Sequence, residues 1–276
     1  MKKILSVLMS LGMTFSLAAC AGSTPSSSEA ASESASASSA AESEAVSSEA
    51  ATSEAAASGT VLSHEEYMAA DLDTEVTIEA YVQAKQSWYA EQATATVYLQ
   101  DQDGAYFAYD MACSEEDYDK LTPGTCIRVT GYKSEWSGEV EITDGTFEFV
   151  DGADTFVAEP LDVTELLGSD ELIDHQNELV SFKGLTVEPS TDANGAEAAF
   201  LYNYDGSGTD GDDLYFNASY NGQTYTFTIE SYLCDNTTEV YQAVKNLQVG
   251  QTIDMEGFLY WYEGVNPHIT SVTVTG

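Results

Sequence analysis

Basic residues are scarce in this sequence. Only eight of its 276 residues are lysine or arginine, against 47 aspartates and glutamates, and the formal net charge is −39. Proteins bind nucleic acids mainly through cations on phosphates, and a strongly acidic surface repels such a partner. The charge therefore makes nucleic acid an unlikely partner, and it is typical of a soluble surface outside the cell or of adaptation to salt.

Residues that carry common enzyme chemistry are also few. None of the three histidines lies in an HExxH or HxxxH pattern, and there is no GxSxG elbow, phosphate loop or Rossmann glycine run. No CxxC pair occurs, which argues against a zinc or dithiol site. Carboxylates are so abundant that two of them can lie close by chance, so they give little support to a carboxylate-dependent hydrolase. We therefore expect a protein that is not an enzyme and needs no cofactor.

Three of the four cysteines, Cys113, Cys126 and Cys234, lie in the body of the chain. In an oxidising space Cys113 and Cys126 are candidates for a disulfide, because the loop that they would close is short. The alternative is that all three are reduced, partly buried thiols.

The first 20 residues have the pattern of a targeting segment. Lys2 and Lys3 precede a short apolar run, which closes with small residues at Leu17-Ala18-Ala19-Cys20. This closing pattern resembles the lipobox of bacterial lipoproteins. The resemblance implies cleavage before Cys20, a lipid on its sulfur and an extracytoplasmic protein anchored to the cell membrane. No other apolar run is long enough to span a bilayer.

Residues 21–60 consist mainly of serine, alanine and glutamate and contain no aromatic residue. Such a segment cannot bury apolar area, so we expect it to be disordered. As a coil it would span roughly 35 Å on average. We interpret it as a tether between the lipid anchor and the folded part.

The rest of the chain contains an internal repeat. The segment from Gly124 to Gly138 recurs from Gly250 to Gly264 without a gap, so that Gly131 corresponds to Gly257. The repeat divides the chain into two units, residues 61–157 and 158–276. The second unit is longer, and most of its extra residues must lie in the Asp- and Gly-rich stretch 188–211.

Each unit reads as three strands, a short helix and two further strands. Hydrophobic alternation and turn signals predict strands at 75–82, 94–100, 105–111, 125–132 and 139–150 in the first unit, and at 179–187, 213–220, 224–234, 252–258 and 267–274 in the second. This order resembles the OB-fold, a five-stranded barrel. We therefore expect a mainly β protein with two tandem five-stranded OB-fold-like barrels, each with a short helix between strands three and four, after the tether. A pair of open β-sandwiches is the alternative.

The resemblance implies ligand binding on strands two and three and on the loops after strands one and four. Aromatic residues and one histidine fall in or near these loops, and we take them as candidate ligand contacts: Trp88, Tyr89, Trp136, Tyr260, Trp261, Tyr262 and His268. Such rings can stack on sugars or bases or hold a protein side chain. Alternatively they fill the barrels, and His268 is a structural hydrogen-bonding residue.

The stretch around residues 205–213 alternates oxygen-bearing side chains with glycine. Asp205, Ser207, Asp210 and Asp212 are candidate ligands for calcium, a hard cation. The alternative is a solvated hairpin loop, because the stretch lacks the glycine and the final glutamate of an EF-hand.

These patterns favour a lipid-anchored, non-catalytic binding module of the cell surface, whose partner is a glycan, a peptide or a protein. Single-stranded nucleic-acid binding is the alternative, supported by fold analogy and by stacking on aromatic rings. The carboxylate-dependent hydrolase ranks third.

Overall fold

The computed structural model describes residues 59–276, which belong to one compact unit. The predicted signal peptide with Cys20, and all but the last two residues of the predicted tether, lie outside the described residues. Within the described part, no helix is both long and apolar enough to cross a membrane.

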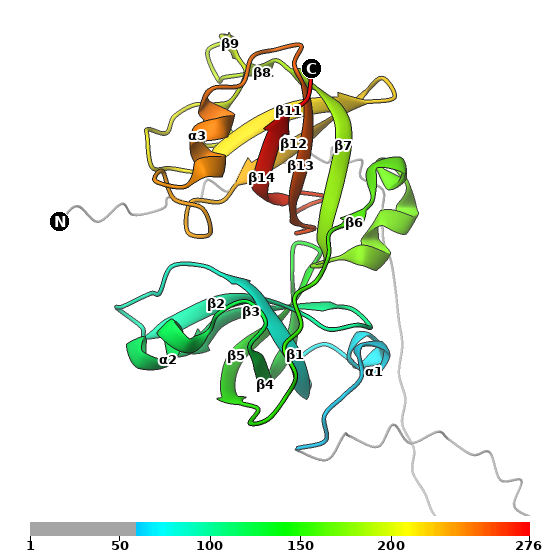
Figure 1. Cartoon of the computed structure of the whole chain (residues 1–276), viewed down its shortest axis with the longest axis vertical. Helices are drawn as coiled ribbons and strands as arrows, with labels where there is room; N and C mark the ends of the chain where they lie inside the picture. Colours follow the sequence, from blue (N-terminus) through cyan, green and yellow to red (C-terminus); the bar gives the residue numbers. More distant parts are fainter. Residues whose placement is uncertain (1–58) are drawn as a thin grey trace, which may run out of the picture. The chain divides into compact units, whose positions relative to one another are not determined.

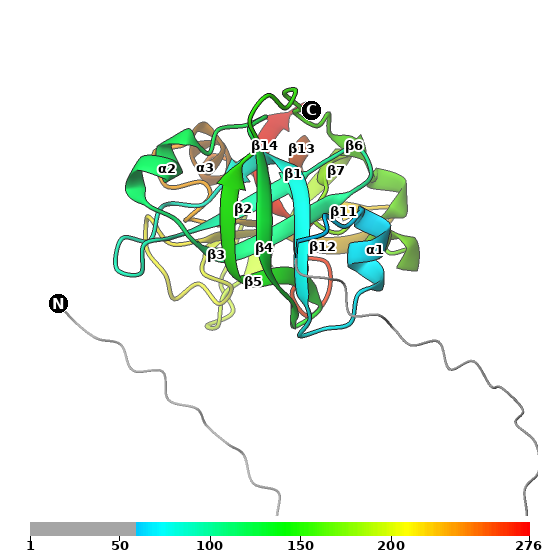
Figure 2. The same cartoon turned by 90° about the horizontal axis from the view of Figure 1, so that it is seen from below.

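The first barrel is closed and has five strands (Figure 1). Its strands are β1 (Glu75–Lys85), β2 (Thr94–Gln100), β3 (Ala105–Ala112), β4 (Cys126–Trp136) and β5 (Glu139–Phe149). Their order around the barrel is β1-β2-β3-β5-β4, and β4 pairs back onto β1. Figure 2 shows β4 between β1 and β5. This is the strand order of an OB-fold, as predicted.

The second barrel repeats this order. Its strands are β7 (Leu179–Glu188), β11 (Leu214–Tyr220), β12 (Gln223–Ile229), β13 (Thr252–Phe258) and β14 (His268–Val274). They follow one another as β11-β12-β14-β13-β7, and an antiparallel pairing of β11 with β7 closes the ring. Closure leaves neither barrel with an open sheet edge and excludes the alternative of two open sandwiches.

The two glycines of the repeat occupy equivalent positions. Gly131 on β4 lies opposite Val76 on β1, and Gly257 on β13 lies opposite Val180 on β7. At each glycine the register with the following strand shifts, which marks a β-bulge. The repeat seen in the sequence is therefore a repeat of the structure.

Short helices are capped as the sequence indicates. α1 (His64–Ala69) begins at a capping box in which Ser63 and Glu66 exchange hydrogen bonds. α2 (Glu115–Lys120) lies between β3 and β4 and is capped by the Ser114 side chain. α3 (Glu239–Lys245) holds the matching place between β12 and β13. Each barrel thus has its helix between strands three and four.

The connections between strands differ from the prediction in three places. β4 runs on to Trp136, so the predicted aromatic loop after strand four of the first barrel is a tight hairpin turn at Ser137 and Gly138. β12 ends at Ile229 rather than at Cys234. The extra residues of the second barrel form three two-residue strands, β8 (Ser190–Thr191), β9 (Glu197–Ala198) and β10 (Leu201–Tyr202).

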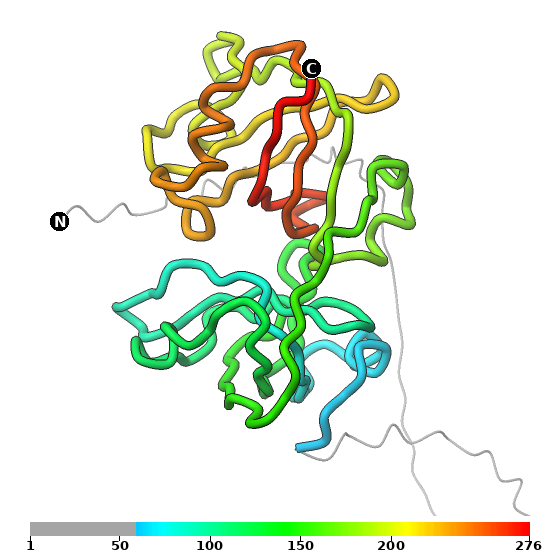
Figure 3. Tube along the Cα trace, viewed as in Figure 1, coloured from blue at the N-terminus to red at the C-terminus, as the bar shows by residue number. Residues whose placement is uncertain are grey.

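The chain passes from the first barrel to the second through residues 150–160 (Figure 3). It then forms β6 (Leu161–Asp162) and the 3-10 helices η1 (Thr164–Leu166) and η2 (Asp170–His175) before entering β7. The Asp162 carboxylate accepts a hydrogen bond from the Thr164 N–H and so caps this short helical segment.

Candidate functional site

The outward face of β2 and β3 is aromatic. Strand alternation places Val97 and Leu99 in the core of the first barrel and Tyr98 outside it. Phe107 on β3 pairs with Tyr98 across the ladder and also faces outward. Both rings are nevertheless almost completely buried, because Phe258 of the second barrel packs on them. The second barrel thus covers part of the face on which the resemblance predicted ligand binding.

Tyr98 makes two contacts with the second barrel. Its ring stacks on Phe258 with centroids 4.4 Å apart, and its hydroxyl shares a 2.7 Å hydrogen bond with Nδ1 of His268. His268 in turn stacks on Tyr260 at 4.2 Å. Burial lowers the pKa of His268 to about 3 and raises the pKa of Tyr98 well above its ordinary value, so both groups are neutral near pH 7.

Removing the Tyr98 hydroxyl should weaken this contact measurably. In Tyr98→Phe the ring still packs, but Nδ1 of buried His268 loses its partner, so we expect a loss of about 1–3 kcal/mol in the free energy of unfolding. Urea denaturation followed by circular dichroism measures this loss. Tyr109→Phe is the matched control, because that side chain is 46% exposed and we expect almost no change. Equal stability of the two variants would contradict the importance of the hydrogen bond.

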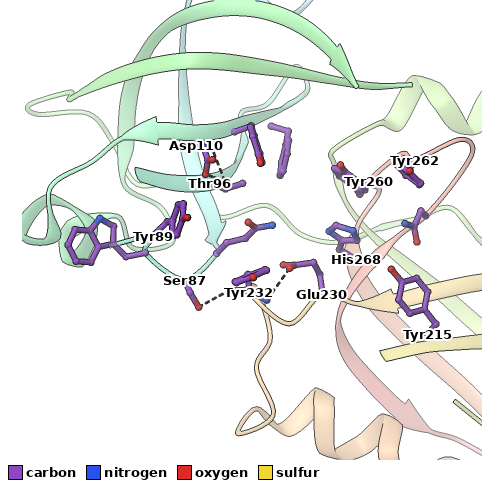
Figure 4. A pocket seen from close by; sticks show the side chains of 15 residues that line it. Ser87, Tyr89, Thr96, Asp110, Tyr215, Glu230, Tyr232, Tyr260, Tyr262 and His268 are labelled. Carbon is purple, nitrogen blue, oxygen red and sulfur yellow. Dashed lines mark hydrogen bonds between the residues drawn. The ribbon is translucent and has the colours of Figure 1, made fainter. Parts of the chain in front are cut away.

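A pocket of about 580 Å³ lies beside this contact (Figure 4). Four of its aromatic lining residues come from the first barrel, Trp88, Tyr89, Phe107 and Tyr109, and four from the second, Tyr215, Tyr232, Tyr260 and Tyr262. Its volume is within the range of small-molecule sites. The pocket is therefore an aromatic cavity to which both barrels contribute walls.

A backbone contact fixes one wall of the pocket. The Ser87 N–H and hydroxyl both donate to the Tyr232 carbonyl, at 2.7 and 3.1 Å. Ser87 belongs to the loop between β1 and β2, and Tyr232 to the turn after β12 (Figure 4). These bonds hold together the two segments that carry Trp88, Tyr89 and Tyr232 at the pocket.

Two carboxylates also line the pocket, one from each barrel. Asp110 lies where the register of β3 against β2 shifts, with φ of 48°, and accepts hydrogen bonds from the hydroxyls of Thr94 and Thr96. Glu230 follows β12 and accepts from the backbone N–H groups of Tyr232 and Leu233, at 3.0 and 2.8 Å. Burial raises the pKa of Glu230 to about 7. Among the residues that the structure describes, no lysine or arginine lines the pocket.

Five of the seven predicted ligand contacts line this pocket: Trp88, Tyr89, Tyr260, Tyr262 and His268. Trp136 and Trp261 do not. Trp136 ends β4 with its side chain 59% exposed, and the ring of Trp261 lies against Gly138 of the first barrel. His268 has both of the roles considered for it, since it lines the pocket and bonds to Tyr98.

The sequence did not single out the two carboxylates, or Phe107 and Tyr109. The only sequence feature that could have indicated these four residues is their place on the predicted third strand of one barrel or the other. Among 47 acidic residues, nothing in the sequence distinguished Asp110 and Glu230.

A second, shallower hollow of about 350 Å³ adjoins the pocket and shares Tyr215, Tyr262 and Asn266 with it. It lies on the outward face of β11 and β12, where hydroxyl and amide side chains such as Asn217 and Thr226 replace the rings of the first barrel.

The candidate disulfide is not formed, since Cys113 and Cys126 are both free thiols. Cys113 packs in the core of the first barrel, whereas Cys126 alternates with buried Ile127 on β4 and so faces outward. Burial raises the pKa of Cys113 to about 11, and Cys234 is free as well. The alternative of reduced, partly buried thiols agrees with the structure.

The four candidate calcium ligands do not converge. Asp205 accepts from the Ser207 N–H, Asp212 accepts from the Thr209 N–H, and Asp210 pairs with Lys245 at 2.5 Å. Within residues 59–276, no group of three or more His, Cys, Asp or Glu side chains is arranged to hold a metal ion.

No protein-family model matches the sequence, and no curated protein matches it. Among solved structures, the chain is similar to the hypothetical protein ygiW from E. coli, with 21% identity and a TM-score of 0.26 over 34% of this chain and 92% of that one. It is also similar to a murine DNA-binding protein bound with double-stranded DNA, with 10% identity and a TM-score of 0.36 over 73% of this chain and 96% of that one. A replication protein A heterotrimer bound to single-stranded DNA matches with 14% identity and a TM-score of 0.29, over 73% of this chain and 49% of that one. Likenesses this weak carry no argument about the ligand of this chain.

Proposed function

We propose that the chain is a non-catalytic, lipid-anchored binding module of the cell surface, whose ligand occupies the aromatic pocket. One observation carries this proposal: five of the seven residues chosen from the sequence as ligand contacts come together in one cavity. They belong to two segments far apart in the chain, the loop after β1 and the stretch from Tyr260 to His268. A cavity with ring faces and hydroxyl groups suits a small ligand or a side chain.

The polar groups of the pocket support binding rather than catalysis. The Ser87 hydroxyl donates to a backbone carbonyl, and neutral His268 is held by Tyr98. An activated nucleophile needs a base within hydrogen-bond reach. The arrangement around Ser87 is not of that kind.

The distribution of cations argues against nucleic acid as the ligand. All six basic side chains in residues 59–276 are engaged within the protein. Lys120, Arg128, Lys183 and Lys245 form ion pairs with carboxylates, and Lys85 and Lys133 donate to backbone carbonyls. Phosphate contacts would have to break these interactions.

The anchoring part of the proposal rests on the lipobox pattern at Cys20. A diacylglycerol group together with a further acyl chain would give durable attachment. Recovery of radiolabelled palmitate in the wild-type protein, and its absence from a Cys20→Ala variant, is the direct measurement.

A fluorescence titration tests the pocket. Since Trp88 lines it, a bound ligand should change the tryptophan emission of the full-length protein, and we would titrate glycans, peptides and oligonucleotides at low salt. Tyr232→Ala should weaken binding by about ten-fold, because that ring loses its contact with the ligand. Tyr132→Ala is the matched control, since Tyr132 is also exposed but does not line the pocket. Tight, salt-sensitive binding of oligonucleotides alone would overturn the proposal in favour of the nucleic-acid alternative.

A further inference from the structure

The pocket is lined by two carboxyl groups that no basic side chain in residues 59–276 pairs with. Asp110 and Glu230 come from different barrels, and neither forms an ion pair within residues 59–276. Figure 4 shows Asp110 on the wall from the first barrel and Glu230 on the wall from the second. Carboxylates out of full contact with water are costly unless they are paired. A cation from outside the chain would supply the missing partner.

Both carboxylates keep capacity to accept further hydrogen bonds. The two threonine hydroxyls reach the same oxygen of Asp110, Oδ1. Each oxygen of Glu230 accepts one backbone N–H. A carboxylate has about four acceptor sites in all, so both groups can take a donor or face a positive charge without losing their present bonds.

The remaining walls select the kind of cation. Tyrosine and tryptophan faces attract cations, and they favour weakly hydrated ions with apolar substituents. A metal ion would need several oxygen ligands at short distance, and no such group occurs among the described residues. An anion would meet two carboxylates and no basic side chain in the pocket.

We infer that the pocket binds an organic ammonium ion, an alkylated or quaternary amine, with its charge near Asp110 and Glu230 and its alkyl groups against the tyrosine rings. This inference rests on the proposed function and narrows it to a ligand class. The same chemistry could reach the pocket as a free small molecule or as a methylated lysine side chain of a peptide.

Matched ligands give the first test. Choline and tetramethylammonium would be titrated into the full-length protein by calorimetry, together with 3,3-dimethylbutanol, the neutral carbon analogue of choline. We expect the two ammonium ions to bind and the neutral analogue to bind at least about ten-fold more weakly. A trimethyllysine peptide that binds about ten-fold more tightly than choline would also support the inference and would identify a side chain as the source.

Matched variants give the second test. Glu230→Gln and Asp110→Asn keep the shape of each side chain and remove its charge, and each should weaken choline binding by about ten-fold. Glu197→Gln and Asp151→Asn are the controls, because both residues are exposed and lie outside the pocket. The comparison of choline with its neutral analogue needs no variant, so the test stands even if one variant fails to fold.

The pH dependence of choline binding tests whether the Glu230 carboxylate contacts the ligand. Choline keeps its charge at every pH, whereas burial raises the pKa of Glu230 to about 7, so affinity should rise as the pH increases through this value. The groups that act on Glu230 or lie beside it are Asp213, Tyr98, Tyr215, Cys234, Tyr260 and His268. Glu139 and Glu141 act on Tyr260 and titrate in the same range. Glu230→Gln separates these contributions, because it should flatten most of the pH dependence.

Equal affinity for choline and its neutral analogue would overturn the inference, and so would unchanged affinity in both charge-removing variants. If the ammonium ions fail but a neutral glycan binds and depends on Tyr232, the ligand class is wrong while the proposed function stands. If no glycan, peptide, oligonucleotide or ammonium ion binds, both fail.

Discussion

Replacing Gly257 by alanine is expected to prevent the second barrel from closing. A Cβ atom at this position would lie 2.3 Å from the His268 carbonyl oxygen and 2.7 Å from Cα of Ile269. Both atoms belong to the backbone of β14, which the ladder with β13 holds in place, so neither strand can move away without losing pairing. We expect a loss of more than about 4 kcal/mol in the free energy of unfolding, among the largest that one substitution causes.

Urea denaturation followed by near-ultraviolet circular dichroism would measure this loss. Gly131→Ala should damage the first barrel in the same way, because its Cβ would lie 2.7 Å from the Thr143 carbonyl oxygen. Gly145→Ala is the control, since the nearest atom there belongs to the flexible side chain of Met111, at 3.0 Å. If Gly257→Ala unfolds at the same urea concentration as Gly145→Ala, the close approach of the strands is not what the repeated glycine provides.

Raising the pH from about 5 to 9 is expected to destabilise the protein, chiefly through Glu139. This side chain is completely buried; one oxygen accepts a 2.9 Å hydrogen bond from the Trp261 N–H, and the other has no partner in the described residues. Burial raises the pKa of Glu139 from 4.5 to about 8. The folded state therefore holds the proton more tightly than the unfolded state does. The contribution of this protonated carboxyl group to the free energy of unfolding is fully present below about pH 4.5. It is lost as the pH rises from there through about 8.

The size of this loss follows from the shift in pKa. A shift of this kind corresponds to about 3–5 kcal/mol between the two ends of the pH range. Burial also raises the pKa of Glu141 and of Glu230, each to about 7, which adds to the loss in the same direction. The glutamine of Glu139→Gln cannot ionise. Between pH 5 and pH 9 the melting temperature of this variant should therefore fall by about 5–10 °C less than that of wild type.

Thermal unfolding at several pH values would measure the effect of Glu139. Glu135→Gln is the matched control, because Glu135 is exposed on the neighbouring strand and its replacement should leave the pH profile unchanged. If the melting temperature of Glu139→Gln falls with pH as steeply as that of wild type, groups other than Glu139 cause the loss of stability.

Much of the fold could be predicted because it depends on local patterns. The repeat gave Gly131 and Gly257 equivalent positions, which the structure shows to be β-bulges, and alternation and turn signals gave the order of strands and helix in each barrel. The loop after strand four was predicted wrongly in the first barrel. Ser137 and Gly138, with φ of 52° and 97°, form a tight turn instead of a loop. As a result Lys133 lies within β4, where it donates to the carbonyls of Met68 and Ala70.

The site was harder to predict than the fold, for a physical reason. Alternation shows that Tyr98 and Phe107 face outward, but it does not show what covers them. Their burial results from packing against Phe258, which lies more than a hundred residues away in the sequence. The ring-bearing loops could be recognised because aromatic residues are conspicuous in loops. The two carboxylates of the pocket could not be recognised in the sequence, because carboxylates occur throughout the chain.

The two barrels are similar, yet they meet through different surfaces. The first presents the outer side of β2 and β3, and the second presents Phe258, Tyr260 and His268 near the ends of β13 and β14. Two like units that meet through different surfaces form a head-to-tail, heterologous pair. It leaves one copy of the shared surface without a neighbour, here the side of β11 and β12 that bears Asn217 and Thr226. The outer surface of β2 and β3 therefore joins the two barrels, whereas the corresponding surface of β11 and β12 has no barrel packed on it within residues 59–276 and forms the wall of a hollow.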